Sequence, residues 1–443
     1  MVKIAVVVLD TLRKDRFDEF FNWIPGCHFN AAYSTANWTA PAHASIFTGL
    51  YPREVGVSAK SRSLTCPEQT VAETLSNQGY DTIAYSANHN ASAANNFDRG
   101  FNDFTGPSAL LNPDDHVLDF EQFLSNSDKK GVTLYWKAVH ECIFGKYDTI
   151  QSLKCGLGKA IGNKALQKNI NDDGASVVAS EITDRNWAED TLFFANLMEA
   201  HTPYDPPEPY NRIGEAVEVT VADTFTGVDD VSRIQEAYDG AAEYLSEIYK
   251  EIFNELATEF DYIITLSDHG ELLGEHGYWN HTYGLYPEVT HVPLVITNTD
   301  ERQNQIVETP VSLLDIYQTI RDIAGLDQQR RGQSLINVDS LKPSDLLAEY
   351  RGLISIARER LFNTGYSDSE VQKYQKSMDA LIGAEGGYWV FQDEQIVFPE
   401  DISETDVFDR LKILTEDLDE VQIDKEDEVS EQVRSQLEDL GYA

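Results

Sequence analysis

The sequence predicts an α/β fold in which helices sandwich a large, mostly parallel β-sheet. Two observations predict this fold class. Short, continuous apolar runs recur along the chain, and such runs are typical of strands buried on both faces of a parallel sheet. Segments with helical periodicity lie between the runs, and alternating strands and helices characterise α/β proteins. With 443 residues, 42% of them hydrophobic, the chain can form one large core with a smaller unit attached.

Five apolar runs are expected to form the strands of this sheet. They cover residues 2–9, 81–87, 191–198, 261–267 and 292–297. Helical patterns are expected to form helices over three further segments, 67–78, 231–260 and 308–325. The last of these is expected to end at Gly325, because glycine is common where a helix stops.

The chain is expected to divide into a main domain over residues 1–340 and a smaller C-terminal α+β unit over 341–443. A polar stretch with weak periodicity at 105–190 predicts a helical insertion in the main domain. In the C-terminal unit we expect a pair of strands within 386–398 and an acidic final helix over 426–440.

The chain is strongly acidic, with 75 Asp and Glu residues against 34 Lys and Arg and a net charge of −41. Because the acidic residues are spread along the whole chain, they favour a halophilic, archaeal source over a dedicated cation-binding surface. A negative field of this size also argues against nucleic acid as a partner.

The cysteine pattern and the apolar runs predict a soluble protein of the cytoplasm. Cys27, Cys66, Cys142 and Cys155 form no CxxC pair, and scattered single cysteines fit a reducing compartment. The opening run MVKIAVVVLD is too short to span a membrane and lacks a signal-peptide cleavage region. The oligomeric state is not predicted.

The segment NWTAPAHASIFTG, at 37–49, looks like a helix with an unusual start. Pro41 suits the beginning of a helix and Gly49 suits its end. Thr39 is then expected at the N-cap, among the free N–H groups where anions bind, with His43 one turn further on the same face. The alternative interpretation is an ordinary capped helix with a surface histidine.

Polar residues stand at the ends of the apolar runs: Asp10, His89, His201, Asp268 and His269. In open α/β sheets, ligands bind beyond the carboxyl ends of the strands. Two carboxylates and an imidazole suit a divalent cation, so Asp10, Asp268 and His269 are candidate metal ligands.

If Thr39 joins this group, metal coordination would lower its pKa and activate it as a nucleophile. Additional histidines would then neutralise the substrate or protonate the leaving group, and the candidates are His43, His89, His201 and His281. For His276 and His291 a structural role is equally favoured.

The chain resembles the sulfatase family of the alkaline phosphatase superfamily. The segments that carry the resemblance are VVVLDTLRKD, TAPAH followed by TGLYP, HTPYDPP, SDHGELLGEHGYWNH, THVPLVI, PVSLLDIYQTI, RGQSL and LEDLGY. They recur in the family's order over nearly the whole chain. The resemblance implies an alkaline-phosphatase-like fold with a smaller C-terminal part.

The resemblance also implies a site. Asp10, Thr39, Asp268 and His269 would bind one divalent ion, either Mn, Ca, Zn or Mg, with Thr39 as the nucleophile. His43, His201 and His281 would be catalytic, and Asn88 and His89 would bind substrate. His281 and Asn88 lie at or near positions where the family often has lysine.

Three positions depart from the sulfatase pattern. Thr39 stands where sulfatases oxidise Cys or Ser to formylglycine, and a threonine cannot form that aldehyde because its Cβ carries a methyl group. His43 replaces an arginine, and Thr11 replaces the second Asp of the usual pair. A threonine nucleophile resembles the phosphodiesterases and phosphoglycerol transferases of the superfamily.

These features predict a metal-dependent hydrolase or transferase that acts on a phosphate, phosphonate or sulfate ester. The substrate would be a small anionic ester or one linked to a glycan or lipid. The alternative is a non-catalytic sulfatase-like binding protein. This alternative stays open because the family's arginine and two lysines are missing from the chain.

Overall fold

The structure is a computed structural model that describes residues 2–107, 110, 172–301, 304–327, 330–393, 395–399 and 406–423. Most of the predicted insertion at 105–190 lies outside the described residues, and so do Cys142, Cys155 and the predicted helix at 426–440.

The core of the protein is an eight-stranded sheet with the order β10-β2-β9-β7-β1-β6-β4-β5. Its strands are β1 Lys3–Leu9, β2 Cys27–Phe29, β4 Asp81–Ser86, β5 Asp103–Thr105, β6 Thr191–Leu197, β7 Tyr262–Leu266, β9 Leu294–Asn298 and β10 Gln305–Val307. All neighbours pair in parallel except β9, which is antiparallel to both β7 and β2. The predicted, mostly parallel sheet is confirmed, and the five predicted strands are β1, β4, β6, β7 and β9.

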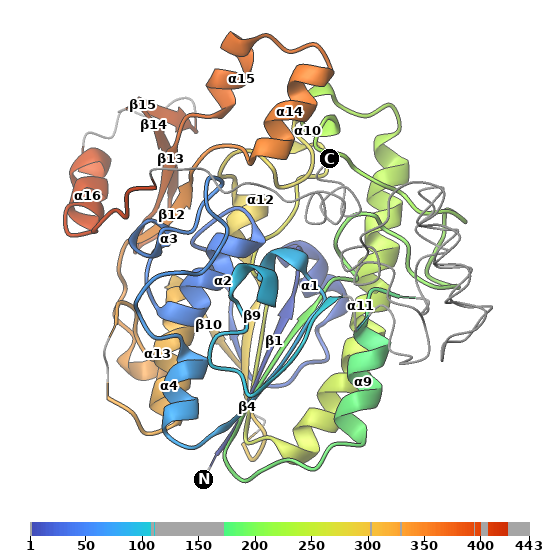
Figure 1. The fold of residues 1–443 in the computed structure, drawn as a ribbon, viewed down its shortest axis with the longest axis vertical. Helices are drawn as coiled ribbons and strands as arrows, with labels where there is room; N and C mark the ends of the chain where they lie inside the picture. The colour runs from blue at the N-terminus through green and yellow to red at the C-terminus, as the bar shows by residue number, and fades with distance from the viewer. Residues whose placement is uncertain are drawn as a thin grey trace, which may run out of the picture.

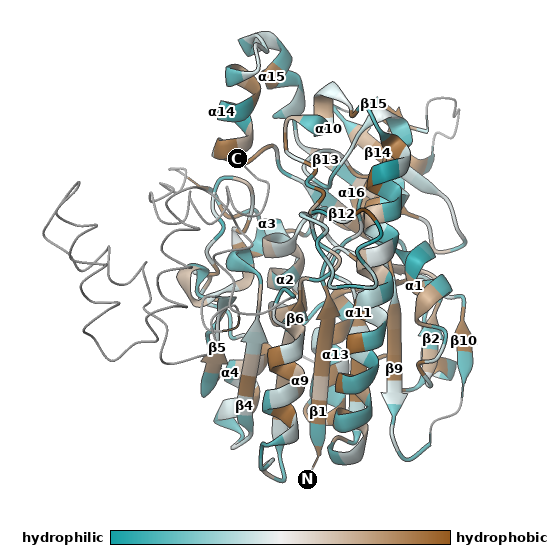
Figure 2. Ribbon diagram, turned by 90° about the vertical axis from the view of Figure 1, so that its right-hand side faces the viewer, coloured by the Kyte–Doolittle hydropathy of each residue, from teal (hydrophilic) through white to brown (hydrophobic). Residues whose placement is uncertain are grey.

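Helices cover both faces of this sheet (Figure 1). They are α1 Lys14–Phe20, α2 Thr39–Thr48, α4 Val71–Asn77, α9 Ala175–Thr183, α11 Val231–Glu259 and α13 Leu314–Ile323. Figure 1 shows α9 and α11 on one side of the strands and α2, α4 and α13 on the other. Strands β1, β6 and β9 are hydrophobic over most of their length (Figure 2), as expected for a sheet covered on both faces.

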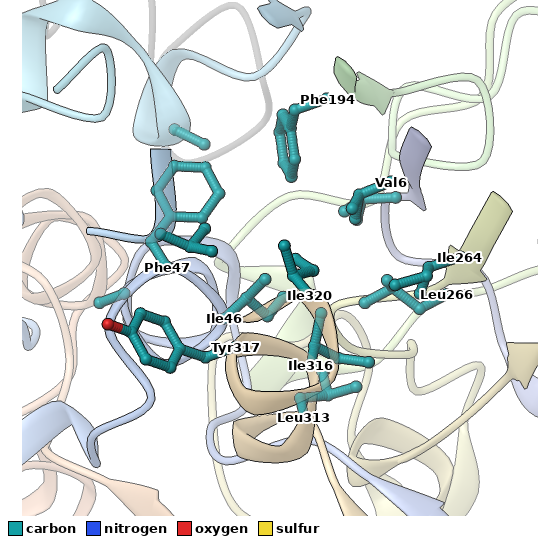
Figure 3. Packing of buried hydrophobic residues seen from close by; sticks show 14 of the residues in the cluster. Val6, Ile46, Phe47, Phe194, Ile264, Leu266, Leu313, Ile316, Tyr317 and Ile320 are labelled. Carbon is teal, nitrogen blue, oxygen red and sulfur yellow. The ribbon is translucent and has the colours of Figure 1, made fainter. Parts of the chain in front are cut away.

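Successive side chains of β1 point to opposite faces of the sheet, so the strand contributes to the apolar core on both faces. Ile4, Val6 and Val8 face the layer of α2, α4 and α13, whereas Ala5, Val7 and Leu9 face α1, α9 and α11. Figure 3 shows the first layer, in which Val6 and Phe194 lie across from Ile46 and Phe47 of α2 and from Ile316 and Ile320 of α13. Helix α2 is therefore packed against the sheet through a buried apolar layer.

The ends of the predicted helices differ slightly from the structure. Helix α4 begins after Thr70, which accepts the N–H of Glu73 while the Glu73 carboxylate accepts the N–H of Thr70. Helix α13 begins only at Leu314, because Val311–Ser312 pairs as strand β11 with β3, Ala32–Tyr33. The left-handed Gly325, with φ of 71°, follows this helix as expected.

A separate antiparallel sheet forms the core of the C-terminal unit, which lies at the top of the molecule in Figure 1. It comprises β12 Leu346–Tyr350, β13 Met378–Ile382, β14 Tyr388–Gln392 and β15 Gln395–Phe398, with helices α14 Ser355–Asn363, α15 Asp368–Tyr374 and α16 Asp406–Thr415. The predicted strand pair within 386–398 is confirmed as β14 and β15. Among the residues that the structure describes, no helix is long and apolar enough to cross a lipid bilayer.

A third, three-stranded sheet has the order β11-β3-β8, with β8 at His291–Val292. The remaining short helices are α3 Pro52–Val55, α10 Asp223–Thr226 and α12 Pro287–Thr290. Arg53 of α3 pairs with the buried carboxylate of Glu349 and, at 2.5 Å, with Asp379. The N–H of Glu349 also donates to the carbonyl oxygen of Thr35 at 2.8 Å, four residues before Thr39. The C-terminal sheet is thus attached to the segment that leads into α2.

Candidate active site

The candidate site lies where three parallel strands end beside the first turn of α2. Leu9 of β1 is in register with Leu197 of β6, and Val8 is in register with Leu266 of β7. Asp10 directly follows β1, and Asp268 follows β7 by two residues. The parallel register therefore brings together side chains that are far apart in the sequence, as expected for an open α/β sheet.

Asp10, Asp268 and His269 form a compact group of buried ligands whose donor atoms lie within 4.8 Å of one another. The Nε2 atom of His269 is 3.5 Å from Oδ2 of Asp268 and 3.9 Å from Oδ1 of Asp10. Nδ1 of His269 donates to the carbonyl oxygen of Gly270 at 3.0 Å, which leaves the Nε2 lone pair facing the carboxylates.

The environment of Asp268 fits a bound cation. Its Oδ2 atom is buried and accepts no hydrogen bond. Burial alone would raise the pKa of Asp268, but His269, His43 and the N–H of Thr11 hold it well below its usual range. Among the described residues, the ion pairs of these two carboxylates involve histidine and neither lysine nor arginine. An ionised, orphaned oxygen beside a second carboxylate and an imidazole suits a divalent cation.

Thr39 lies at the edge of this group. Its hydroxyl donates to Nε2 of His269 at 3.3 Å and accepts from Nδ2 of Asn88 at 3.0 Å. Ligands bound at about 2.0–2.2 Å from a common ion lie roughly 3–3.5 Å apart, so the hydroxyl could share an ion with His269.

The prediction that Thr39 is the N-cap of α2 is wrong. Trp38 is the N-cap, because it is extended and its carbonyl oxygen accepts the N–H of Ala42 at 3.3 Å. Thr39 is the first helical residue and Pro41 the third, while Gly49 ends the helix in the left-handed region as predicted. Because the Thr39 hydroxyl does not cap the helix, it is directed to Asn88 and His269 instead.

The interpretation of His43 as a surface residue is also wrong, because its side chain is fully buried. Nδ1 of His43 donates to the carbonyl oxygen of Thr39 at 3.0 Å, and Nε2 accepts from the Asn196 amide at 3.1 Å. The rings of Phe47, Phe97 and Phe194 stand nearly edge-on to the imidazole, with centroids 5.9–6.4 Å away.

Thr11, which departs from the family pattern, connects the two carboxylates. Its hydroxyl donates to Oδ1 of Asp10 at 2.8 Å, and its N–H donates to Oδ1 of Asp268 at 3.3 Å. The residue has φ of 64°, which is rare for a β-branched side chain. Tyr238 of α11 supports this turn, donating to the Thr11 carbonyl oxygen and accepting the N–H of Arg13.

A row of three imidazoles extends from the ligand group. The ring of His281 lies 4.4 Å from that of His269 and 5.3 Å from that of His201, measured between centroids. Nδ1 of His281 is 3.2 Å from Oε1 of Glu271, whose other oxygen accepts from Tyr204 at 3.3 Å. Burial lowers the pKa of His281 well below its usual value and raises the pKa of Glu271 to about 7.

The remaining predicted residues occupy different positions. Asn88 is buried, and its amide contacts Asp10 as well as Thr39. His89, next to it, is half-buried, and its carbonyl oxygen accepts from Ser92 and Asn95.

His276 and His291 have partners away from the ligand group. The His276 ring stacks on Tyr286 at 4.4 Å and contacts Glu288 at 3.1 Å. Nε2 of His291 donates to the carbonyl oxygen of Asn30, and the ring stacks on Tyr33. These contacts support a structural role for both residues.

Sequence reasoning missed two residues in the site. Asn196 is fully buried in β6 and donates from Nδ2 to Oδ2 of Asp10 at 2.9 Å. A single amide in the apolar run TLFFANL was a visible signal, because a buried polar side chain needs a partner. Glu271 follows the DHG tripeptide and was visible as another acid beside the candidate ligands.

Comparisons with known proteins agree with this geometry. A family model described as "Sulfatase" matches residues 21–326. The chain is 22% identical over 354 residues to "Uncharacterized sulfatase YidJ" of Escherichia coli (strain K12), covering 73% of this chain and 66% of that protein. Human "Arylsulfatase K" is 36% identical over 103 residues, which cover 20% of this chain and 19% of that protein. The chain thus matches less than two thirds of either relative's length.

A solved structure, phosphonate monoester hydrolase SpPMH from Silicibacter pomeroyi, matches with a TM-score of 0.58 at 15% identity and covers 94% of each chain. This likeness establishes the fold.

Proposed function

Because the chain belongs to the sulfatase family, we propose that it is a hydrolase or transferase of anionic esters that uses one divalent cation and Thr39 as its nucleophile. The observation that carries this proposal is the position of the Thr39 hydroxyl, 3.3 Å from Nε2 of His269 and beside two buried carboxylates. The alternative of a non-catalytic binding protein is less favoured, because all four proposed ligands are retained together.

The ligands of the cation would be Asp10, Thr39, Asp268 and His269. When bound, the ion would polarise the ester and stabilise the alkoxide of Thr39. An imidazole ligand favours Mn²⁺ or Zn²⁺, whereas the two carboxylates also suit Ca²⁺ or Mg²⁺.

The chain's own residues would prepare Thr39 and hold the proton of the leaving group. The Asn88 amide donates to the Thr39 hydroxyl oxygen, so it would orient that oxygen and stabilise developing negative charge. His201 and His281 are proposed to protonate the leaving group. Because burial lowers the pKa of His281, its protonated form would be abundant only at acidic pH, so turnover of esters with poor leaving groups would be fastest there and would fall as pH rises.

We propose phosphodiesters or phosphonate monoesters as better substrates than sulfate esters. Thr39 cannot become formylglycine, so a covalent intermediate would be an ester of threonine itself. Phosphothreonine can be attacked at phosphorus by water or an acceptor alcohol, consistent with phosphoryl transfer. The substrate would be a small anionic ester or one linked to a glycan or lipid, and the protein is proposed to act in the cytoplasm.

The test is a screen of chromogenic phosphodiester, phosphonate and aryl sulfate esters in molar salt, with metal-free and metal-loaded protein. Wild type loaded with metal should turn over at least one phosphorus ester, and Thr39→Ala should lose several orders of magnitude in rate. Absence of turnover at full metal occupancy would favour the binding protein, and near-normal rates in Thr39→Ala would exclude Thr39 as nucleophile.

A further inference from the structure

Three hydrogen bonds join four buried residues in a continuous chain from the nucleophile position to the metal-ligand position. The carbonyl oxygen of Thr39 accepts from Nδ1 of His43, and Nε2 of His43 accepts from Nδ2 of Asn196. The same Nδ2 atom donates to Oδ2 of Asp10. All four residues have no exposed side-chain surface.

The orientation of the Asn196 amide follows from its partners. A carboxylate oxygen can only accept, so the amide nitrogen must face Asp10. The opposite orientation would place Oδ1 of Asn196 against both the Asp10 carboxylate and the His43 nitrogen. The observed orientation leaves Oδ1 of Asn196 buried without a partner. Because a buried oxygen without a partner is costly, this orientation indicates that the two hydrogen bonds donated by Nδ2 outweigh that cost.

The same contacts define the hydrogen positions on His43. Nδ1 carries the hydrogen that the Thr39 carbonyl oxygen accepts, and Nε2 must lack one because it accepts from Asn196. Three aromatic rings surround the imidazole, and its Nδ1 atom also lies 3.4 Å from Oδ2 of Asp268. Phe47 and Phe194, two of these rings, belong to the packed layer of Figure 3, which restricts movement of the ring.

We propose that Asn196 and His43 are positioning residues that form a hydrogen-bonded link, which orients the Asp10 carboxylate relative to Thr39. This inference rests on the proposed function, because its purpose is to preorganise the metal ligands. At the position of the family's arginine, His43 then connects α2 to β6 through hydrogen bonds to Thr39 and Asn196. Without the link, the Asp10 carboxylate would keep Asn88 and Thr11 as donors, and Asn88 would still connect it to the Thr39 hydroxyl, but the connection to the second turn of α2 through His43 would be lost.

The test is the affinity for Mn²⁺, measured by calorimetric titration of the metal-free protein in molar salt. Asn196→Leu and His43→Phe preserve volume but break the link, and each should weaken binding about 10–100-fold. The double variant should be no weaker than the poorer single variant, because both changes remove the same link. His43→Gln retains an acceptor for Asn196 and should restore most of the affinity. Thr191→Val, a buried polar change at the far end of β6, should leave the affinity unchanged.

A second measurement needs no metal. In metal-free wild type labelled with ¹⁵N-histidine, the Nε2 resonance of His43 should be that of an unprotonated nitrogen that accepts a hydrogen bond. The resonance is assigned by its loss in His43→Gln, and it should shift in Asn196→Leu.

The outcomes separate this inference from the proposed function. If wild type binds no Mn²⁺, the proposed metal dependence fails, while the nitrogen resonance still tests the link. If wild type binds Mn²⁺ and Asn196→Leu binds it equally well, the positioning role is wrong. A protonated Nε2 on His43, or additive losses in the double variant, would also overturn the link.

Discussion

Asp315 should make the protein less stable as pH rises from 4 to 8. This carboxyl is 3% exposed at the start of α13, where its two oxygens accept the N–H groups of Ser312 and Gln333. Burial raises its pKa from 3.8 to about 6, in spite of these donors. The helix matters for the site, because Tyr317 of α13 packs against α2 in the layer shown in Figure 3.

The sign of the effect follows from linkage between ionisation and folding. Because the folded-state pKa is raised, the stabilising contribution is fully present below about pH 4, and it is lost as pH rises through about 6. A shift of about two pKa units corresponds to roughly 3 kcal/mol of unfolding free energy. About 2–3 kcal/mol of this change should fall between pH 4 and pH 8.

The assay is urea unfolding of wild type and Asp315→Asn at constant molar salt across this pH range. Many other carboxylates titrate in a protein with 75 acidic residues, so the informative quantity is the difference between the two proteins. The variant loses one acceptor at every pH, a constant cost that cancels when pH values are compared. The unfolding free energy of wild type minus that of the variant should fall by about 2–3 kcal/mol.

Asp322→Asn is the matched control on the same helix, because this carboxylate is exposed. Its difference from wild type should vary little with pH. If the Asp315→Asn difference were flat, or grew as pH rises, the argument from burial would be wrong.

Three further outcomes are expected. Thermal melts at rising KCl should show an increasing midpoint, because screening relieves the repulsion of a net charge of −41; a midpoint indifferent to salt would contradict the halophilic interpretation. Phe194→Ala should lower the unfolding free energy by about 3–5 kcal/mol in denaturant titrations, because the ring is only 3% exposed and packs between β6 and α2. A loss below about 1 kcal/mol would show instead that the layer can collapse around the cavity. His281→Gln should slow esters with poor leaving groups more than activated aryl esters in steady-state kinetics, and equal slowing of both would rule out leaving-group protonation by this residue.

Five of the eight strands could be predicted from the sequence because each is a continuous apolar run bounded by polar residues, whereas β2, β5 and β10 have only three residues each and carry no such signal. The candidate ligands could be predicted for the same reason, since parallel strands place Asp10 and Asp268 at one edge. The assignment to the sulfatase family is confirmed by the family model over 21–326. The direction of β9 could not be predicted, because an apolar run carries no information about its partner's orientation.

The errors concern positions where side-chain contacts decide between similar local patterns. A threonine before Ala-Pro fits both an N-cap and a first helical residue, and the extended backbone of Trp38 decides between them. The burial of His43 depends on aromatic rings from α2, β6 and the segment at Phe97, which one helix pattern cannot reveal. The Asn196 link depends on two residues more than 150 positions apart in the sequence.

Trapping a covalent intermediate tests the central claim most directly. Metal-loaded protein is mixed with a slow phosphodiester or phosphonate substrate, quenched in acid, digested and sequenced by mass spectrometry. The account predicts a phosphoryl or phosphonyl group on Thr39, its absence in Thr39→Ala, and its disappearance when the protein is chased without substrate. Turnover by wild type with an unmodified Thr39 peptide at every quench time, or with the group on another residue, would contradict Thr39 as the nucleophile.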